Sequence, residues 1–489
     1  MLYIGSTMRT AILTLSLLFS GFLTIAQDYH HWSEHFGTRA TLLGGAATSG
    51  LGDNATVYYN PAAMAFVEDP SISISVNAYR LRFLNLKNAL GEGLDLKSTQ
   101  FSTFPNLIAG ITTFKKAPAI RLGYSVLTRR FYANKFDFLH QANYDILSGT
   151  AGQEIFVGSY NLNHRMNEYW AGFGVSWRPT KSFSMGFSHF GIYRDVKYSN
   201  SHATYVMPED GTFGDVPNVS TNVTFNYWNV KGIFKPSIAL SLDNFKFGMS
   251  VTTPSFNIMG RASVYRDYSI LNFDELLGFD VSIIDRADKV KAIHKEEGSI
   301  AFGVSWKLGR RSWLHWTNET YFGGQFYHIF NPEQRPSTFP TTFSDSTLST
   351  FFGGENFLSY GEETVPITNI GIGFESRFND RWEMYLGMRT DFLYNERPYY
   401  TYSTIGVESS KWHILHLSYG MVHTTKKGKR YTAGIEYGVA PKRPYYHILD
   451  YTTPSVNNGL IGNGSANGIA SQHSFKIVFG VVLMNKDKT

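Results

Sequence analysis

The stretch FGTRATLLGGAATSGLGDNATVYYNPAA, residues 36–63, stands apart from the rest of the chain because glycine and alanine crowd around Gly44 and Gly45. It ends in Asn60-Pro61, a dipeptide that starts turns because Asn hydrogen-bonds to its own backbone and Pro fixes φ. Small residues let a backbone lie close against another surface. We therefore predict that residues 27–70 form a compact plug, and that the chain after Asp69 forms the wall around it.

The composition narrows the class of protein. Of 489 residues, 16% are aromatic and only 17% are charged, and 45 are glycine. After the N-terminus, no run reaches the roughly 18 consecutive apolar residues that a membrane-spanning helix requires. These values indicate an all-β protein whose surfaces need not be charged, a class that includes outer-membrane barrels. The net charge of +5, without any lysine-arginine block, argues against nucleic acid as a partner.

Residues 1–26 are typical of a secretory signal peptide. Arg9 supplies the positive region, residues 11–25 supply the apolar region, and a small-residue cleavage site precedes Gln27. The alternative is an N-terminal membrane anchor, but the apolar run is short and polar residues follow at once. We expect the mature chain to lie outside the cytoplasm. It has no cysteine, which excludes disulfides, zinc-thiolate sites and cysteine nucleophiles.

From Ser71 onward the dominant pattern alternates large apolar residues with small or charged ones, which is typical of β-strands. The segment from Trp382 to Asp391 shows it clearly. The alternation predicts about fourteen strands within residues 71–484, followed by a polar tail at 485–489. These strands lie near 71–81, 103–115, 118–131, 167–177, 182–196, 225–243, 245–255, 298–308, 312–327, 366–378, 381–394, 411–424, 430–443 and 471–484.

The connections between these strands alternate in length. Tight turns such as Asn379-Asp380 alternate with long loops, predicted at 82–102, 132–166, 197–224, 256–297, 328–365, 395–410 and 444–470. Short turns at one end and long loops at the other are the geometry of an antiparallel outer-membrane barrel, with the turns in the periplasm. A soluble β-sandwich shares the alternation but has no reason to keep this parity. Tryptophans near several strand ends favour the membrane barrel as well.

The polar face of the strands should point into the barrel, since lipid tolerates Lys or Arg only at a cost of roughly 2 to 4 kcal/mol at the midplane. A fourteen-stranded lumen is too wide for wall side chains to fill alone. The predicted plug is available to fill it. The charged residues assigned to the interior or its rims are Arg121, Lys231, Lys235, Asp243, Lys246, Glu375, Arg377, Glu383, Arg389, Asp391, His416 and Glu436.

Residues 36–66 resemble the N-terminal hatch of the FadL long-chain fatty-acid transporter family, which includes TodX-like hydrocarbon transporters. PorV-type proteins of type IX secretion are similar in this signature. The resemblance implies a fourteen-stranded barrel with the hatch inside, extracellular loops that collect an apolar ligand, and passage by hatch rearrangement or through a gap in the wall. The matching residues are Gly37, Arg39, Gly44, Gly45, Asp53, Asn60, Pro61 and Ala62.

Two further features bear on a ligand. The loop from Asn272 to Ile284 is apolar and could form a short amphipathic helix. One face of this helix would carry the residues that are candidates for ligand capture, which are Phe273, Leu276, Leu277 and Ile284. Such a patch would capture a hydrophobic molecule, or would simply pack the loops together. Pro236 lies inside a predicted strand and cannot donate a hydrogen bond to the ladder, so we expect a bulge there. The resemblance to the FadL family offers an alternative, since a kinked strand in that family can open a lateral gate.

Catalytic chemistry is not expected. His30, His31 and His35 lie close together, but no carboxylate or further histidine at ligand spacing accompanies them, so no metal site is predicted. The chain contains no G-x-S-x-G elbow. We predict a protein that is not an enzyme and that needs no cofactor.

Two functions remain open at this point. The first is passive transport of long-chain fatty acids or other hydrophobic compounds across the outer membrane of a Gram-negative bacterium. The second is an accessory or structural barrel, such as a PorV-like carrier of secreted proteins or a subunit of a larger complex. The expected partners are outer-membrane lipid and a hydrophobic small molecule, with a protein partner at the extracellular loops in the second case.

Overall fold

The computed structural model describes residues 30–67, 71–147, 151–208, 216–272, 280–332, 358–394, 412–426, 428–447, 449–462 and 466–484. The predicted signal peptide and the polar tail lie outside these ranges. No helix within them has the length and apolar character needed to cross a membrane.

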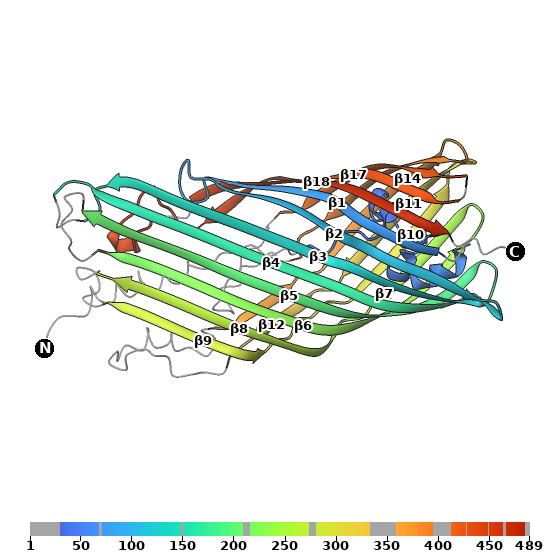
Figure 1. Ribbon diagram of the computed structural model, residues 1–489, viewed down its shortest axis with the longest axis horizontal. Coiled ribbons are helices and arrows are strands. Elements are labelled where there is room, and N and C mark those ends of the chain that lie inside the picture. The colour runs from blue at the N-terminus through green and yellow to red at the C-terminus, as the bar shows by residue number, and fades with distance from the viewer. Residues whose placement is uncertain are drawn as a thin grey trace.

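The described strands form a closed antiparallel barrel with fourteen strand positions (Figure 1). We call each position a stave, whether it is filled by one strand or by two strands that follow one another. Successive staves pair around the ring, with β11 next to β14 because β12 and β13 lie outside it, and β18 closes the ring by pairing with β1. The strands are β1 (Ser71–Lys87), β2 (Leu96–Phe114), β3 (Ala117–Tyr144), β4 (Glu154–Trp177), β5 (Phe183–Pro208), β6 (Asn218–Ser241), β7 (Phe245–Thr252), β8 (Phe256–Leu271), β9 (Val281–Lys291), β10 (Ser299–Lys307), β11 (Ser312–Tyr321), β12 (Gly324–Phe330), β13 (Tyr360–Thr364), β14 (Ile367–Arg377), β15 (Trp382–Asp391), β16 (Ile414–Thr424), β17 (Arg430–His447) and β18 (Ala466–Met484).

Eighteen strand segments make fourteen staves because two staves consist of two segments each and two further segments form a separate hairpin. Strands β7 and β8 follow one another along β6, and β9 and β10 likewise succeed one another on the far side of them. The hairpin β12–β13 forms a separate small sheet. The predicted all-β barrel and its strand number are therefore confirmed.

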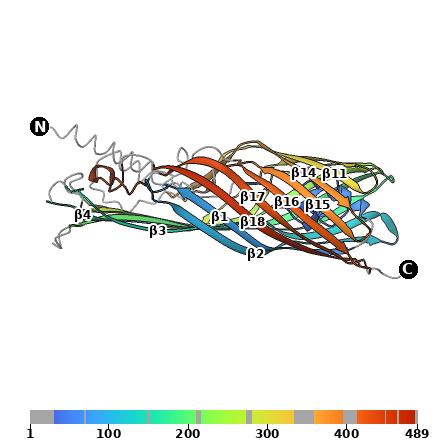
Figure 2. The ribbon, with the colours of Figure 1, turned by 90° about the horizontal axis from the view of Figure 1, so that it is seen from above.

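The strands on one side of the barrel are much longer than the sequence pattern predicted. Strand β3 has 28 residues and pairs with β4 up to Tyr144. The prediction of long loops at 132–166, 197–224 and 256–297 was wrong, because most of those residues extend β3, β4, β5, β6, β8 and β9. The outward face of these extensions is polar, as at Asn161 and Asn163, which resembles a loop in the sequence. Figure 2 shows the resulting elongated shape from above.

The alternation has the predicted polarity around the ring. On β1, Ile72 and Ile74 are 46% and 41% exposed, whereas Ser73 and Ser75 face the lumen. Asp243 and Arg377 are exposed at strand ends and Arg121, Lys246 and Glu375 are partly buried, whereas the other charged residues assigned to the interior or its rims are buried. The buried ones are Lys231, Lys235, Glu383, Arg389, Asp391, His416 and Glu436.

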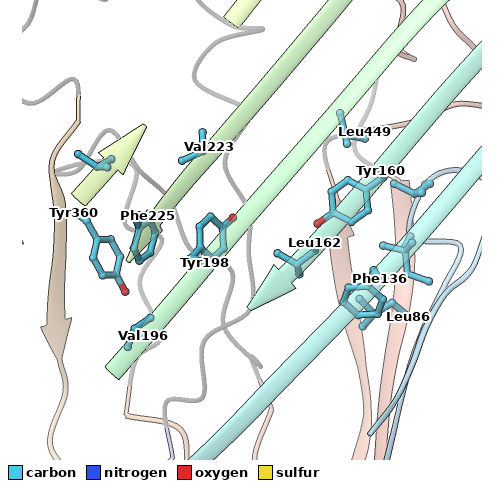
Figure 3. Close-up of a cluster of buried hydrophobic side chains, with 14 of the residues drawn as sticks. Leu86, Phe136, Tyr160, Leu162, Val196, Tyr198, Val223, Phe225, Tyr360 and Leu449 are labelled. Carbon is cyan, nitrogen blue, oxygen red and sulfur yellow. The ribbon is translucent and has the colours of Figure 1, made fainter. Parts of the chain in front are cut away.

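The interior contains two large apolar clusters, one at each end. The cluster near the short turns combines residues 36–59 with wall residues such as Trp170 and Phe190. The cluster between the long strands contains aromatic and aliphatic side chains of the wall itself, together with residues of the connections, such as Leu449 and Tyr451. Figure 3 shows part of this second cluster, with Tyr198, Phe225 and Tyr360 in close proximity.

Candidate functional site

The N-terminal segment, residues 30–67, is almost entirely buried and contacts wall strands from β1 to β18. It contains three short helices, α2 (Thr38–Leu42), α3 (Thr56–Tyr59) and η1 (Pro61–Phe66). In Figure 1 these helices lie among the strands near the short-turn end of the barrel. We describe this segment as the candidate site because the resemblance to a hatch rests on its residues.

The Asn60-Pro61-Ala62 motif connects the segment to β5 and β6. The Asn60 side-chain amide donates to Thr48 O at 2.8 Å and to Ile238 O at 3.1 Å, and its oxygen accepts from Ala62 N at 3.1 Å. Ala62 N also donates to Ser237 Oγ at 2.9 Å. Pro61 begins helix η1, where its missing N–H leaves no hydrogen bond unmade. The motif therefore caps a helix and binds two strands of the wall at once.

The glycines of the motif allow close approach. Gly37, with φ +84°, precedes α2 and donates to Asn106 Oδ1 at 3.1 Å. Gly44 and Gly45 both have positive φ, and Gly44 lies directly against the wall, where a Cβ atom at Gly371 or Gly387 would overlap its backbone. Glycine on both sides thus brings two backbones together, as the small-residue pattern predicted for this stretch.

Arg39 and Asp53 face the short-turn end. The Arg39 guanidinium binds Glu375 Oε2 of β14 at 2.5 Å and also donates to Leu51 O. Asp53 Oδ1 accepts from Ala55 N at 3.1 Å. Burial raises the pKa of Asp53, and the nearby Arg39 offsets this only in part. Arg39 therefore ties the segment to the wall by a charged pair.

A second set of ion pairs holds the start of the segment. The buried Glu34 carboxylate binds Arg80 of β1 at 2.6 Å and Lys476 of β18 at 2.9 Å. Lys476 also binds Glu436, which in turn pairs with Arg389. Arg389 and Glu436 were predicted to lie inside the barrel, whereas Glu34, Arg80 and Lys476 were not. Lys476 lies on the small and polar face of a predicted strand, which signals it. Arg80 has the parity of the outward Ile72 and Ile74 and reaches the lumen because the register shifts between Asn77 and Tyr79, and no pattern signals Glu34.

A β-bulge delivers two adjacent arginines to the same place. The register between β3 and β4 shifts at Arg129, so Arg129 and Arg130 both point inward, which strict alternation forbids. Arg129 Nη1 donates to His31 O at 2.6 Å, and Arg130 Nη2 lies 3.0 Å from His31 Nδ1. The His31 ring also stacks on Tyr321. Period-two reasoning could not find this pair, because a bulge breaks the period.

Three side chains next to Arg130 have the spacing of metal ligands. Ligand atoms of Glu168, His294 and Glu296 all lie within 4.8 Å of one another. However, Lys231 Nζ lies 2.6 Å from His294 Nδ1, 2.8 Å from Glu296 Oε1 and 3.5 Å from Glu168 Oε2. The ammonium group thus occupies the position of a cation. This cluster is better described as an ion-pair network than as a metal centre.

The wall has a seam between β2 and β3. Backbone pairing of these strands runs from Phe114 and Ala117 to Leu107 and Leu127. Beyond that point, within the described residues, the strands are linked by side-chain bonds, such as Thr128 Oγ1 to Pro105 O at 2.8 Å. The rings of Phe104 and Phe131 stack across the seam, with centroids 5.2 Å apart. Side chains therefore close the wall between β2 and β3, whereas backbone hydrogen bonds close it between β1 and β2 and between β3 and β4.

Pro236 lies on β6, close to the break between β7 and β8 in the neighbouring stave. Its pairing with Phe187 of β5 is in register, so no bulge forms on that side. Phe234, two residues earlier, exchanges hydrogen bonds with Thr253 on the opposite side. Alternate residues face the same way, so the missing donor of Pro236 points toward the break between β7 and β8. Its role as a gate stays a prediction.

The proposed capture helix is wrong in part. Ile284 belongs to strand β9, where it pairs with Asp267 and is 50% exposed, because an alternating pattern continues from Val281 to Lys291. Phe273, Leu276 and Leu277 lie outside the described residues.

Comparison with solved structures addresses the fold. A FadL homologue of Pseudomonas aeruginosa superposes with a TM-score of 0.56 at 12% identity, covering 95% of this chain and 99% of that one. The toluene transporter TodX of Pseudomonas putida gives 0.58 at 12% identity, covering 92% and 99%. The toluene transporter TbuX of Ralstonia pickettii gives 0.55 at 11% identity, covering 92% and 98%.

The chain has the FadL/TodX-type fold. At 11 to 12% identity this similarity shows a shared backbone fold and does not identify a substrate for this chain. No family model and no curated protein sequence matches the chain. The predicted resemblance in fold is confirmed, and the roles of individual residues stay open.

Proposed function

We propose that this chain is a passive transporter of hydrophobic compounds, such as long-chain fatty acids, in the outer membrane of a Gram-negative bacterium. In this proposal the long-strand end captures the compound, residues 30–67 act as the hatch, and the compound leaves through the wall. The FadL/TodX-type fold and the apolar outward face of the barrel support the membrane location.

The observation that carries the proposal is the seam between β2 and β3. A hydrophobic compound in the lumen needs a route to lipid that does not cross a polar opening. A ladder of backbone hydrogen bonds opposes such a route, but stacked side chains can move aside by rotamer changes. Phe104 is buried and Phe131 is partly buried, and their stacked rings cover the seam.

The test is a cross-link across this seam. Because the chain has no cysteine, the pair Phe104→Cys and Phe131→Cys introduces the only two thiols. Oxidation should abolish uptake of a labelled fatty acid by cells, and a reductant should restore it. The matched control is Ala109→Cys with Ser125→Cys, a pair already in register across the paired part of β2 and β3, which should leave uptake unchanged. Full cross-linking at the seam with normal uptake would contradict this route.

A second function is favoured by the length of the strands on one side. A strand needs roughly 9 to 11 residues to cross a bilayer, whereas β3 has 28 and β5 has 26. The outward face of their distal halves is polar, as at Lys135 and Lys197. This surface suits a protein partner, so an accessory barrel of the PorV-like kind is the second candidate. Recovery of a stoichiometric partner from membranes would favour it, and recovery of barrels with bound lipid alone would favour transport.

A further inference from the structure

A cavity of about 480 Å³ opens at the short-turn end of the barrel. Its inner wall is the N-terminal segment, through Arg39, Gly52 and Asp53, and its sides come from the adjacent ends of β7, β10, β11, β14 and β17. It therefore lies on the side of the segment that faces away from the long strands.

The lining of this cavity is strongly positive. Seven lysine and arginine side chains contribute to it, against two carboxylates, Asp53 and Glu375, and two of the seven, Arg377 and Arg430, pair with Glu383 outside the lining. Glu375 is already bound to Arg39. Lys307 and Arg310 have no carboxylate partner among the described residues. The cavity thus contains cationic groups that its own acids do not neutralise.

The surroundings have the same sign. The short turns at this end contain further cations, including Lys115 and Lys116 between β2 and β3, and Arg178 and Lys181 between β4 and β5. A recess lined by charges of one sign raises the local concentration of counter-ions. Arginine in particular matches the planar oxygens of carboxylate and phosphate groups.

We propose that this cavity binds the carboxylate or phosphate group of an anion, supplied either by a free solute or by a lipid headgroup. The anion would lie among Lys246, Lys307 and Arg310, beside the Arg39–Glu375 pair. The site is independent of what the barrel transports, because it requires only the segment and the strand ends that surround it.

Trp313 provides a built-in reporter. It lines the cavity, and Lys246 Nζ lies 5.2 Å from the centroid of its ring. The probe is trichloroacetate, an anionic quencher of tryptophan fluorescence, titrated into the full-length protein in neutral detergent, with neutral acrylamide as the reference quencher. The difference between the native protein and Trp313→Phe isolates the Trp313 signal.

We expect saturable quenching of Trp313 by trichloroacetate, reversed by inorganic phosphate. The double variant Lys246→Gln, Lys307→Gln should weaken this binding by about tenfold or more, since each charged hydrogen bond contributes on the order of a factor of ten. The matched control, Lys115→Gln with Lys116→Gln, removes two cations of the same end that do not line the cavity and should change binding less than about twofold.

Linear, non-saturating quenching that is equal in the native protein and the cavity variant would overturn the proposal. Lipid nanodiscs separate the two sources of the anion. If phosphatidylglycerol discs block trichloroacetate and phosphatidylcholine discs do not, the site takes an anionic headgroup. If both discs leave binding intact, it takes a free anion.

Discussion

The two ends of the lumen are filled in different ways. At the short-turn end, another part of the chain, residues 30–67, enters the barrel and meets a wall of glycines and polar side chains. At the long-strand end, the aromatic and aliphatic side chains of the wall itself meet, as Tyr198, Phe225 and Tyr360 do. The first filling combines an apolar cluster with many hydrogen bonds and ion pairs to the wall, whereas the second is held mainly by burial of apolar surface.

This difference has a mechanical consequence. Water can replace the hydrogen bonds of the N-terminal segment, so these contacts cost little to break, whereas its apolar residues and its buried ion pairs lose stabilisation when the segment leaves the wall. Opening the aromatic cluster exposes apolar surface at roughly 25 cal/mol per Å², for which water offers no substitute. We therefore expect the short-turn end to be the mobile half of the lumen and the long-strand end to be the rigid half.

The largest effect is expected from Gly186→Val on β5. A Cβ atom at Gly186 would overlap the backbone of Pro61 and Ala62. The backbone cannot move aside as a side chain can, so docking of the segment should lose about 3 kcal/mol or more. Single-channel recording should show an open pore, and hydrogen exchange should show loss of protection in residues 30–67 alone.

The control for this substitution lies on the same strand. At Gly191 a Cβ atom would meet only Ala171 O, at 3.8 Å, which is an ordinary contact. Gly191→Val should therefore leave a closed barrel. A closed barrel in both variants would mean that the segment does not depend on the glycine wall.

The next largest effect is expected from Glu34→Gln. The side chain is fully buried between Arg80 and Lys476, so its loss leaves two buried cations with less compensation. Breaking a buried pair in this way costs about 3 to 5 kcal/mol. Arg286→Gln, in an exposed pair with Asp288, should cost less than about 1 kcal/mol. Chemical denaturation of both variants checks the difference, and equal losses would contradict it.

A smaller effect is expected from pH, through His31. Burial, and then the positive charges of Arg130 and Arg129, hold the pKa of His31 well below the ordinary value of 6.5, although Asp391 and Glu168 oppose the shift. The undocked segment binds a proton below pH 6.5 and the docked segment does not, so docking weakens as the pH falls. The loss should approach about 1.4 kcal/mol per pH unit.

Hydrogen exchange at pH 7.5 and 5.5 tests this dependence in both halves. Protection of residues 30–67 should fall at the lower pH, while the strands around Phe225 should be unaffected. In His31→Gln the pH dependence should become shallower, with a remainder from His35, whose pKa is also lowered by burial. An unchanged slope in that variant would assign the effect to other groups.

The smallest effect is expected from Pro236→Ala. The missing donor points to a break in the neighbouring stave, and the pairing with β5 is already in register. A restored N–H should thus change stability by less than about 1 kcal/mol. If uptake nevertheless falls while the barrel stays folded, Pro236 acts as a gate. Normal uptake would end that hypothesis.

Much of the fold could be predicted because it depends on local patterns. The period-two alternation from Ile300 to Trp306 and from Trp382 to Asp391 lies on β10 and β15 as expected. The extensions of β3 to β6 could not be predicted, because outward residues such as Asn161 and Asn163 meet water, and a strand with polar residues on its outer face has the composition of a loop. The bulge at Arg129 could not be predicted either, because it shifts the two-residue alternation by one position.

The sequence by itself determined that this chain forms an alternating, antiparallel wall with a small-residue segment ahead of it, because strand polarity and turn chemistry are set by residues a few positions apart. Only the tertiary structure decided which wall residues hold that segment. Glu34 and Lys476 are 442 positions apart, and nothing in the local pattern of either indicates the other. Closing the ring brings β1 beside β18, and the buried charges then pair because the low-dielectric interior leaves them no other partner.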